Sequence, residues 1–232
     1  MKITVVGASG LIGTKVVDLL TRQGNEVVAS SRTTGVDVLT GEGLADALAG
    51  AAALVDVTNS PSFEDDPVLR FFTASTTNLV AAAKDTGVGH YVVLSIVGVD
   101  GLPLSGYMRA KVVQEKLVTE SGLPYTIVRA TQFAEFTDAI TASMTVGDEV
   151  RVPDALIQPV AADDVAADVA RAATAQPLNG VVNIGGAEKI SFEQMARTSL
   201  ARQGDESKTV VVDPEGTYFG TPLEQRSLVT PD

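Results

Sequence analysis

Glycines at regular spacing lie near the start of the sequence, at Gly7, Gly10 and Gly13. They follow an apolar run and open a segment of helical periodicity, so we expect a turn between a strand and a helix. There the first glycine permits the tight turn, the second lets the backbone approach a pyrophosphate, and the third lets helix and strand pack closely. The helix's free amides and positive end favour phosphates without any lysine, which predicts a dinucleotide-binding loop. Its expected contacts are Gly7, Ser9, Gly10, Leu11, Ile12 and Gly13.

The end of the second expected strand carries the residues that would select between the nicotinamide cofactors. An acidic residue about 20 positions after the glycines would hold the adenine ribose of NAD, but the sequence has Ser30, Ser31 and Arg32 there. Two hydroxyls and a guanidinium suit a 2′-phosphate, because arginine pairs with phosphate oxygens through two bonds. We therefore expect NADP(H) to be preferred, with NAD(H) as the alternative. Arg32 as a solvated loop residue is the competing interpretation, and Asp37 either reaches the adenine amino group or has an ordinary loop role.

With these residues the chain resembles the short-chain dehydrogenase/reductase superfamily, specifically its atypical, NmrA-like branch of NAD(P)H-binding proteins. The resemblance runs from Met1 to about Gly186, and its glycine loop is shared with the whole superfamily. More specific to this branch are Leu94–Gly98 and the run from Tyr107–Lys111 through Tyr125–Phe133. The resemblance implies a Rossmann-type fold and a nicotinamide cofactor.

The resemblance also implies a catalytic set of Ser95, Tyr107 and Lys111. In active members a serine ends the fourth strand and Tyr-x-x-x-Lys opens the next long helix, and here the serine precedes the tyrosine by 12 positions. Residues four apart share a helix face, so the ammonium and the positive helix end are expected to lower the tyrosine pKa from about 10 toward neutrality. Tyr107 would then give a proton to a substrate oxygen held by Ser95, while nicotinamide delivers hydride. The family lysine also contacts the nicotinamide ribose, a role carried over to Lys111; ordinary surface positions on an amphipathic helix are the alternative.

One position departs from the pattern of active members. Aligning Thr76-Thr77-Asn78-Leu79 with the Gly-Thr-x-Asn-Leu of the extended members places Phe72 where many carry a proton-relay asparagine. The leading hypothesis is an NADP(H)-dependent oxidoreductase acting on a small carbonyl, enone or quinone-like substrate. The alternative is a non-catalytic NAD(P)H-binding redox sensor or regulator, and a third is a reaction with transient oxidation such as sugar-nucleotide epimerisation.

Polar residues after two further strands are candidate cofactor contacts. Thr58 and Asn59 follow the third strand, where the family's loop passes the ribose and phosphates; a purely structural loop is the other interpretation. Ala130 and Thr131 leave the fifth strand at the carboxyl edge, where ligands of parallel sheets bind. Backbone groups there would hold the carboxamide of nicotinamide.

The elements that must position these residues alternate between short apolar runs and longer helical segments. This rhythm predicts an α/β fold: a doubly wound, Rossmann-type parallel sheet with helices on both faces and a small interleaved C-terminal lobe. The expected strands are Ile3–Val6, Glu26–Ser30, Ala53–Val57, Tyr91–Ser95 and Tyr125–Arg129. The expected helices are Leu11–Gln23, Gly43–Ala49, Pro67–Thr86 and Ser105–Ser121.

The predicted organisation is a dinucleotide-binding core over residues 1–133, to which 157–186 return. Residues 134–156 and 187–232 are expected to form the smaller substrate lobe, with a strand at Thr209–Val212. The returning segment would hold a strand at Ile157–Val160, a helix at Asp163–Ala175 capped by Asp163, and a strand at Val181–Ile184. A further helix, Ser191–Gln203, would be capped by Ser191. Phe133 and Phe136 either wall the substrate pocket or join the cores of the two lobes.

Composition excludes several other functions. The 232 residues are 45% hydrophobic and 20% charged, carry a net charge of −12, and include no cysteine and one histidine, His90. These counts exclude disulfides and thiolate metal sites and make a histidine-based metal site unexpected, so we expect no metal and a structural His90. An acidic surface repels nucleic acid and anionic membranes, which leaves a small-molecule substrate as the expected partner. With no signal-peptide pattern and no apolar run of about 18–20 residues, a cytoplasmic location is expected.

Overall fold

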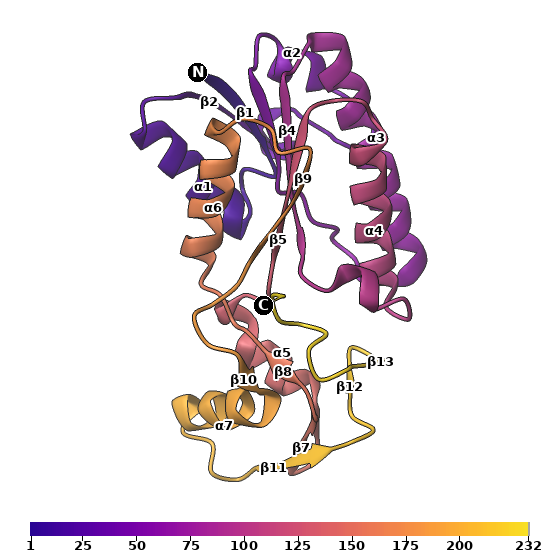
Figure 1. The fold of residues 1–232 in the computed structure, drawn as a ribbon, viewed down its shortest axis with the longest axis vertical. Helices are drawn as coiled ribbons and strands as arrows, with labels where there is room; N and C mark the ends of the chain where they lie inside the picture. The colour runs from indigo at the N-terminus through magenta and orange to yellow at the C-terminus, as the bar shows by residue number, and fades with distance from the viewer. Residues whose placement is uncertain (232) are drawn as a thin grey trace.

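A six-stranded parallel sheet forms the larger part of the computed structural model, which describes residues 1–231 (Figure 1). Its strand order is β2-β1-β3-β4-β5-β9. β2 lies on one side of β1 and β3 lies on the other, so the direction in which successive strands are added reverses at β1. A reversal of this kind opens a crevice at the carboxyl ends of the strands, where ligands bind in such sheets. The strands are β1 (Lys2–Val6), β2 (Glu26–Ser30), β3 (Ala53–Asp56), β4 (His90–Ile96), β5 (Tyr125–Ala130) and β9 (Gly180–Ile184).

Helices cover both faces of this sheet. One face packs against α1 (Leu11–Arg22) and α6 (Ala162–Thr174), whose side chains Val16, Leu20 and Val169 are fully buried with Val92 of β4. The other face packs against α2 (Leu44–Leu48), α3 (Asp65–Thr86) and α4 (Gly106–Thr119). Buried side chains recur every four residues along α1, at the spacing that one helix face requires, and this is why its sequence folds as a helix against the sheet.

A smaller part lies beyond the carboxyl ends of the strands and has its own apolar core, which includes Val150, Phe192 and Leu228 (Figure 1). Its helices are α5 (Thr137–Ser143) and α7 (Phe192–Gln203), and its three-stranded sheet has the order β11-β7-β6. The remaining helices are the short 3₁₀ turns η1 (Arg32–Thr34), η2 (Val99–Gly101) and η3 (Ala134–Phe136). The strands of this part are β6 (Thr145–Val146), β7 (Glu149–Pro153), β8 (Leu156–Ile157), β10 (Ile190–Ser191), β11 (Thr209–Asp213), β12 (Thr217–Tyr218) and β13 (Thr221–Pro222).

The predicted fold class is confirmed, and several local expectations are corrected. The helix expected at Asp163–Ala175 begins at Ala162 after Ala161, and the Asp163 carboxylate accepts from Lys15 Nζ at 2.6 Å instead of capping the helix. The strand expected at Ile157–Val160 is instead the two-residue β8, which ends at Ile157. Val160 lies beyond it and forms an isolated bridge with Phe133. Ser191 does cap α7, accepting from the Gln194 amide at 3.0 Å. The division into two lobes with the stated boundaries stays a prediction.

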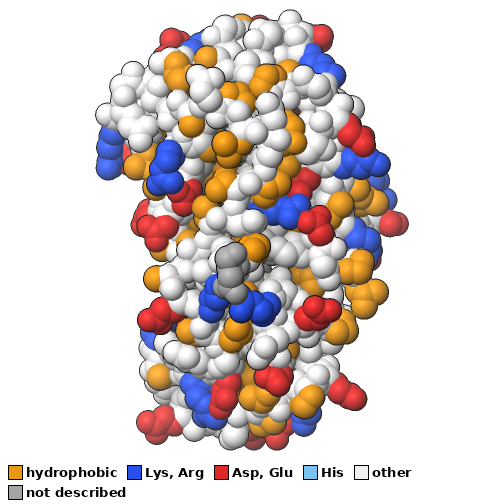
Figure 2. Space-filling model, in the orientation of Figure 1, with side chains coloured by type: hydrophobic (Ala, Val, Ile, Leu, Met, Phe, Trp, Pro, Cys, Tyr) orange, Lys and Arg blue, Asp and Glu red, His pale blue; other side chains and the backbone are white. Residues whose placement is uncertain are grey.

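Charge is spread rather than segregated on the visible face. Figure 2 shows acidic and basic side chains interspersed over both parts of the molecule. Among the helices of residues 1–231, none combines the length and the apolar character needed to cross a membrane.

Candidate cofactor and active site

The glycine loop joins β1 to α1 in the geometry that its spacing predicts. Gly7 has φ +85°, a backbone conformation that favours glycine, and its amide donates to the Ser30 carbonyl at 3.1 Å. A Cβ on Gly13 would overlap the Gly7 carbonyl, so this position admits no larger residue. Both glycines are therefore needed to form the turn and to seat α1 on the sheet.

Gly10 has a different environment, and it tests whether the loop fits a pyrophosphate. A Cβ there would make a slightly tight contact with the Gly7 carbonyl oxygen, at 3.3 Å, and would meet no other described atom within 4 Å, so the side of Gly10 away from the turn is unobstructed. Ser9, Gly10 and Leu11 are exposed, and the amides of the first helical turn have no acceptor within α1. Open space beside unpaired amides at a positive helix end is what a pyrophosphate requires. The loop thus fits the dinucleotide that the sequence predicts.

The residues after β2 form a hydroxyl-rich turn around Arg32. Ser31 Oγ lies 2.7 Å from Thr33 Oγ1, and the Ser31 amide donates to Thr34 Oγ1 at 2.9 Å. The Arg32 guanidinium is exposed and forms no ion pair with residues 1–231. Ser30 is only 1% exposed, and its hydroxyl is buried with no hydrogen-bond partner among the described residues. The groups available to a 2′-phosphate here are therefore Ser31 and Arg32, together with Thr33 and Thr34, which no sequence motif had marked.

Three other predicted cofactor contacts are engaged within the protein. The Asp37 carboxylate accepts from the Leu39 amide at 2.8 Å, as an ordinary turn aspartate does. The Thr58 hydroxyl donates to Asp56 Oδ1 at 2.7 Å, and Asn59 Oδ1 accepts from the Tyr107 hydroxyl at 2.8 Å. The loop after β3 therefore reaches across to α4, and Asn59 lies beside the predicted catalytic tyrosine.

Tyr107 opens α4 within a group of aromatic rings. Its ring centroid lies 5.3 Å from that of Phe63 in the loop after β3, and 5.9 Å from that of Phe72 on α3. Burial raises the pKa of Tyr107 to about 12. The expected lowering toward neutrality is therefore wrong for this structure, because the low-dielectric surroundings disfavour phenolate. The tyrosine is a protonated acid at neutral pH.

Lys111 lies one turn further along α4 and is also buried. Its Nζ donates to the Leu94 carbonyl at 2.8 Å and to Gln114 Oε1, and it lies 4.6 Å from the centroid of the Phe72 ring. Burial lowers the pKa of Lys111 to about 8, against the opposing influence of Asp56 and Glu115. The hydrogen bonds of the ammonium thus go to Leu94 and Gln114, and Lys111 can act on the Tyr107 hydroxyl only through its charge.

Ser95, at the end of β4, completes the predicted set. Alternate residues of this strand, Tyr91 and Val93, pack against the layer of α3 and α4, so Ser95 projects toward the same layer as Tyr107 and Lys111. Its hydroxyl is buried and has no hydrogen-bond partner among residues 1–231. A buried hydroxyl without a partner is uncommon, and a substrate oxygen would satisfy it.

The end of β5 carries the last predicted contacts. Ala130 is buried in the strand, and the Thr131 amide donates to the Ile184 carbonyl at 3.0 Å while its hydroxyl donates to the Gln158 carbonyl. Phe133 and Phe136 stack with ring centroids 5.7 Å apart, and Phe136 is exposed. Thr131 thus joins the end of β5 to the segment between β8 and α6, and Phe133 packs against the sheet core that includes α1 and α6.

Asp56 and Tyr218 are two further candidate functional residues that the sequence motifs did not predict. Asp56 is fully buried and hydrogen-bonds to Gln114, which in turn contacts Lys111; an acidic residue ending an apolar strand was the signal for it. Tyr218 on β12 is close enough to Tyr107 for the two to interact electrostatically, and burial together with that interaction raises the pKa of Tyr218. Nothing local in the sequence pairs residues so distant along the chain.

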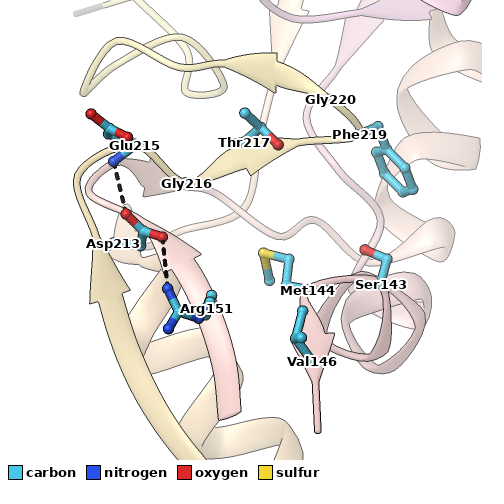
Figure 3. A pocket seen from close by; sticks show the side chains of 10 residues that line it. All are labelled: Ser143, Met144, Val146, Arg151, Asp213, Glu215, Gly216, Thr217, Phe219 and Gly220. Atoms are coloured by element: carbon cyan, nitrogen blue, oxygen red, sulfur yellow. Dashed lines mark hydrogen bonds and ion pairs between the residues drawn. The ribbon is translucent and has the colours of Figure 1, made fainter.

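Two cavities lie in or beside the smaller part. One of about 290 Å³ separates the β12–β13 hairpin from α5, and Figure 3 shows Phe219 and Met144 on its opposite sides, with Arg151 bonded to Asp213 at its rim. The other, of about 430 Å³, lies between the loop after β4 and the C-terminal segment, and Arg129 lines it. Neither of these two is lined by the glycine loop or by Tyr107.

The chain matches a known protein family over most of its length. The NAD(P)H-binding family matches residues 7–176, which include the glycine loop, Ser95, Tyr107 and Lys111. The chain belongs to this family. A curated relative is a photosystem II assembly factor, Ycf39, from Cyanophora paradoxa, with 28% identity over 147 residues, 57% of this chain. The chain spans about half the length of that relative, 46%.

Several solved structures share the fold of this chain. An NADPH-dependent quinone oxidoreductase from Escherichia coli has 22% identity and a TM-score of 0.65, covering 91% of this chain and 77% of its own. A dTDP-4-dehydrorhamnose reductase from Bacillus anthracis, in complex with NADP, has 15% identity and a TM-score of 0.72, covering 91% and 84%. A third, MoeE5 in complex with UDP-glucose and NAD, has 21% identity and a TM-score of 0.72, covering 91% and 85%. These likenesses show that the chain has a Rossmann-type fold.

Proposed function

We propose that the protein is an NADP(H)-dependent oxidoreductase that reduces a small carbonyl, enone or quinone-like substrate. The observation that carries the proposal is the juxtaposition on α4 of Tyr107 and Lys111, one turn apart, on the face of the sheet toward which the unpartnered Ser95 hydroxyl projects. A hydroxyl acid, a cation and an unsatisfied hydroxyl donor are the groups that reduction of a carbonyl requires.

Each residue has a distinct role in this proposal. A bound NADPH would supply the hydride to the substrate carbon. Ser95 would donate a hydrogen bond to the substrate oxygen and orient it, and Tyr107 would transfer its hydroxyl proton to that oxygen as the negative charge develops. Because its pKa is about 12, Tyr107 carries this proton throughout the neutral range. Lys111 would stabilise the phenolate that remains.

The preference for NADP(H) rests on the turn after β2. Arg32 is exposed and has no ion-pair partner among residues 1–231, and Ser31, Thr33 and Thr34 surround it with hydroxyls. A guanidinium ringed by hydroxyl donors complements the dianionic 2′-phosphate, whereas NADH offers only a neutral hydroxyl there. Likenesses to proteins named for NADPH and NADP agree with this preference, and one crystallised with NAD keeps NAD(H) as the alternative.

The test is consumption of NADPH against a panel of aldehydes, ketones, enones and quinones, with direct titration of NADPH and NADH by fluorescence. We expect tight binding of NADPH and turnover with at least one class of substrate. The double variant Ser95→Ala/Tyr107→Phe, which retains Arg32 and the glycine loop, should bind NADPH normally and reduce nothing. NADPH binding without turnover across the panel would exclude the enzyme.

A second candidate, a non-catalytic NAD(P)H sensor, has its own supporting observation. Tyr107 donates to Asn59 and packs against Phe72, so its hydroxyl is already occupied, and an apolar ring fills the position where many extended members of the superfamily carry a relay asparagine. In a sensor this contact would report cofactor binding through the loop after β3. Limited proteolysis within residues 57–64, with and without NADPH, distinguishes this role: a sensor changes cleavage there while showing no turnover.

A further inference from the structure

Within residues 1–231, the buried ammonium of Lys111 has no carboxylate among its direct hydrogen-bond partners, and a neutral side chain lies between it and a carboxylate. In this part of the chain, the ammonium contacts three polar or aromatic partners: it donates hydrogen bonds to the Leu94 carbonyl and the Gln114 side-chain oxygen, and it lies over the face of Phe72. None of the three carries a negative charge. A buried cation is stable only when hydrogen bonds and a counterion compensate for its lost hydration, so the counterion must lie one step further away.

Asp56 lies at that next step. It ends β3, is 0% exposed, and accepts four hydrogen bonds. Its Oδ1 accepts from the Thr58 amide at 3.0 Å and the Thr58 hydroxyl at 2.7 Å, and its Oδ2 accepts from the Tyr91 hydroxyl at 3.0 Å. The fourth bond, at 2.9 Å, comes from Gln114 Nε2. All four of these donors belong to the protein, so the carboxyl group of Asp56 is fixed in place from both of its oxygens.

Gln114 therefore connects a buried anion to a buried cation. Its amide nitrogen donates to Asp56 and its amide oxygen accepts from Lys111, so the amide dipole is aligned between the two charges. Glu115 is the other carboxylate that acts on Lys111, but Arg129 binds it at 2.5 Å and 2.9 Å. Tyr91 and Tyr107, the remaining titratable neighbours, are neutral because burial raises both pKa values.

We propose that Asp56 and Gln114 are positioning residues of the active site, which keep Lys111 charged and fix its ammonium beside β4. The inference rests on the proposed function, and it explains how the site manages with Phe72. An apolar ring excludes the water that would otherwise solvate the ammonium, and the Gln114–Asp56 pair replaces that solvation. An amide passes no proton without changing tautomer, so the role of the pair is electrostatic and positional.

The pKa of Lys111 gives this role a measurable signature. Burial lowers it from 10.5 to about 8, and Asp56 is the largest influence in the opposite direction. Removing the negative charge should lower the pKa further, so that the lysine loses its proton near neutrality. Removing only the connecting amide should act in the same direction, because it also removes a hydrogen bond to the ammonium.

The experiment follows the Lys111 side chain by NMR in protein labelled with ¹³C-lysine, its signal being assigned by its loss in Lys111→Arg. The titration midpoint is compared in the wild type and in Asp56→Asn, Gln114→Met and Gln114→Glu. Asp18→Asn, which removes an exposed carboxylate on α1, is the matched control. We expect Asp56→Asn and Gln114→Met to lower the midpoint, the first by about one pH unit or more, and Gln114→Glu to raise it.

Unchanged midpoints in Gln114→Met and Gln114→Glu, whatever their thermal stability, would overturn the proposal. These two variants decide the matter even if Asp56→Asn fails to fold. Where a substrate is turned over, the pH profile of kcat/KM should move with the midpoint. Absence of turnover in every variant, with the midpoints shifting as expected, would refute the proposed function while supporting the electrostatic pairing.

Discussion

Arg32 and Lys111 are both cations of the proposed site, yet their surroundings are opposite. At the nucleotide end of the proposed site, which comprises Gly7–Gly13 and Ser31–Thr34, Arg32 is exposed and unpaired among residues 1–231. At the proposed chemical end, which comprises Ser95, Tyr107 and Lys111, the lysine is buried, makes two hydrogen bonds within the protein and lies over the Phe72 ring. Arg32 therefore has no internal partner among the described residues to give up when a ligand binds. At the other end, Tyr107 and Lys111 already have hydrogen-bond partners within the protein, and only the Ser95 hydroxyl has none among residues 1–231. Binding and chemistry should respond separately to mutation.

The largest expected effect tests the chemical end. Tyr107→Phe removes one hydroxyl from a ring held by Phe63 and Phe72, so the packing should survive. Turnover should fall by about 10²–10⁴-fold, the usual contribution of a general acid, with the NADPH dissociation constant unchanged. Steady-state kinetics and fluorescence titration measure the two quantities. Tyr125→Phe, at the start of β5, is the control; full turnover by Tyr107→Phe would remove this tyrosine from the mechanism.

The next effect tests the nucleotide end through its backbone. Gly10→Leu should fold with a small adjustment of the turn, because its Cβ would make one slightly tight contact, 3.3 Å from the Gly7 carbonyl oxygen, but its side chain would occupy the path of the pyrophosphate. We expect NADPH affinity to fall about 100-fold or more, since charge-assisted bonds of about 1.5–3 kcal/mol each are lost. Calorimetric titration and thermal melting measure affinity and folding. Gly89→Ala, where a Cβ makes only an ordinary contact at 3.5 Å, is the control. Undiminished affinity in Gly10→Leu would place the cofactor elsewhere.

A smaller effect should separate the two cofactors. Arg32→Ala removes a charge-assisted contact to the 2′-phosphate, so NADPH should bind roughly 10- to 100-fold more weakly while NADH affinity stays constant. The ratio of the two dissociation constants is the measurement. Arg22→Ala, which removes an exposed arginine paired with Asp18 on α1, should leave the ratio unchanged. Equal loss for both cofactors would show that Arg32 acts through the fold and not through the phosphate.

The smallest effect concerns pH and the buried ammonium. Between pH about 8 and 10.5 the unfolded chain keeps a proton on Lys111 that the folded protein has released, so wild-type stability gains a contribution as the pH rises. Lys111→Met lacks this contribution. Its free energy of unfolding should therefore decline relative to the wild type across this interval, as measured by urea denaturation from pH 7 to 10. Lys116→Met, an exposed position on the same helix, should run parallel to the wild type; a parallel Lys111→Met would show that the ammonium is solvated.

Sequence periodicity predicted the sheet well because its strands are buried on both faces and its helices repeat an apolar side. It predicted β2 at Glu26–Ser30 without error, and it placed α1 to within one residue. The region after Ala130 was harder, since β6, β8 and β10 are two residues long and take their form from tertiary pairing. Alternating polarity cannot be read from so short a strand.

The candidate site residues were also predictable only where a motif lies within a single element. Spacing brought out the glycine loop and the pair on α4, because each motif lies within a single element. It did not foresee that Asn59 would accept the Tyr107 hydroxyl, or that Asp56 would reach Lys111 through Gln114, since these contacts join loops and strands far apart in the chain. The lowered tyrosine pKa was also expected on charge alone, whereas desolvation is the larger influence.

The position of β9 has a consequence for how the chain is made. The chain leaves the sheet after Ala130, builds α5 to β8, and only then supplies α6 and β9 to the face and edge it left behind. During synthesis on the ribosome, β5 is therefore an unpaired edge strand until β9 has been made. Over the same period, the apolar side of α1 lacks the α6 side chains that complete its core. Such long-range completion slows folding and exposes an edge that invites wrong pairing. A chain cut short before Ile184 would consequently be an unfinished sheet prone to aggregate, and not a smaller cofactor-binding domain.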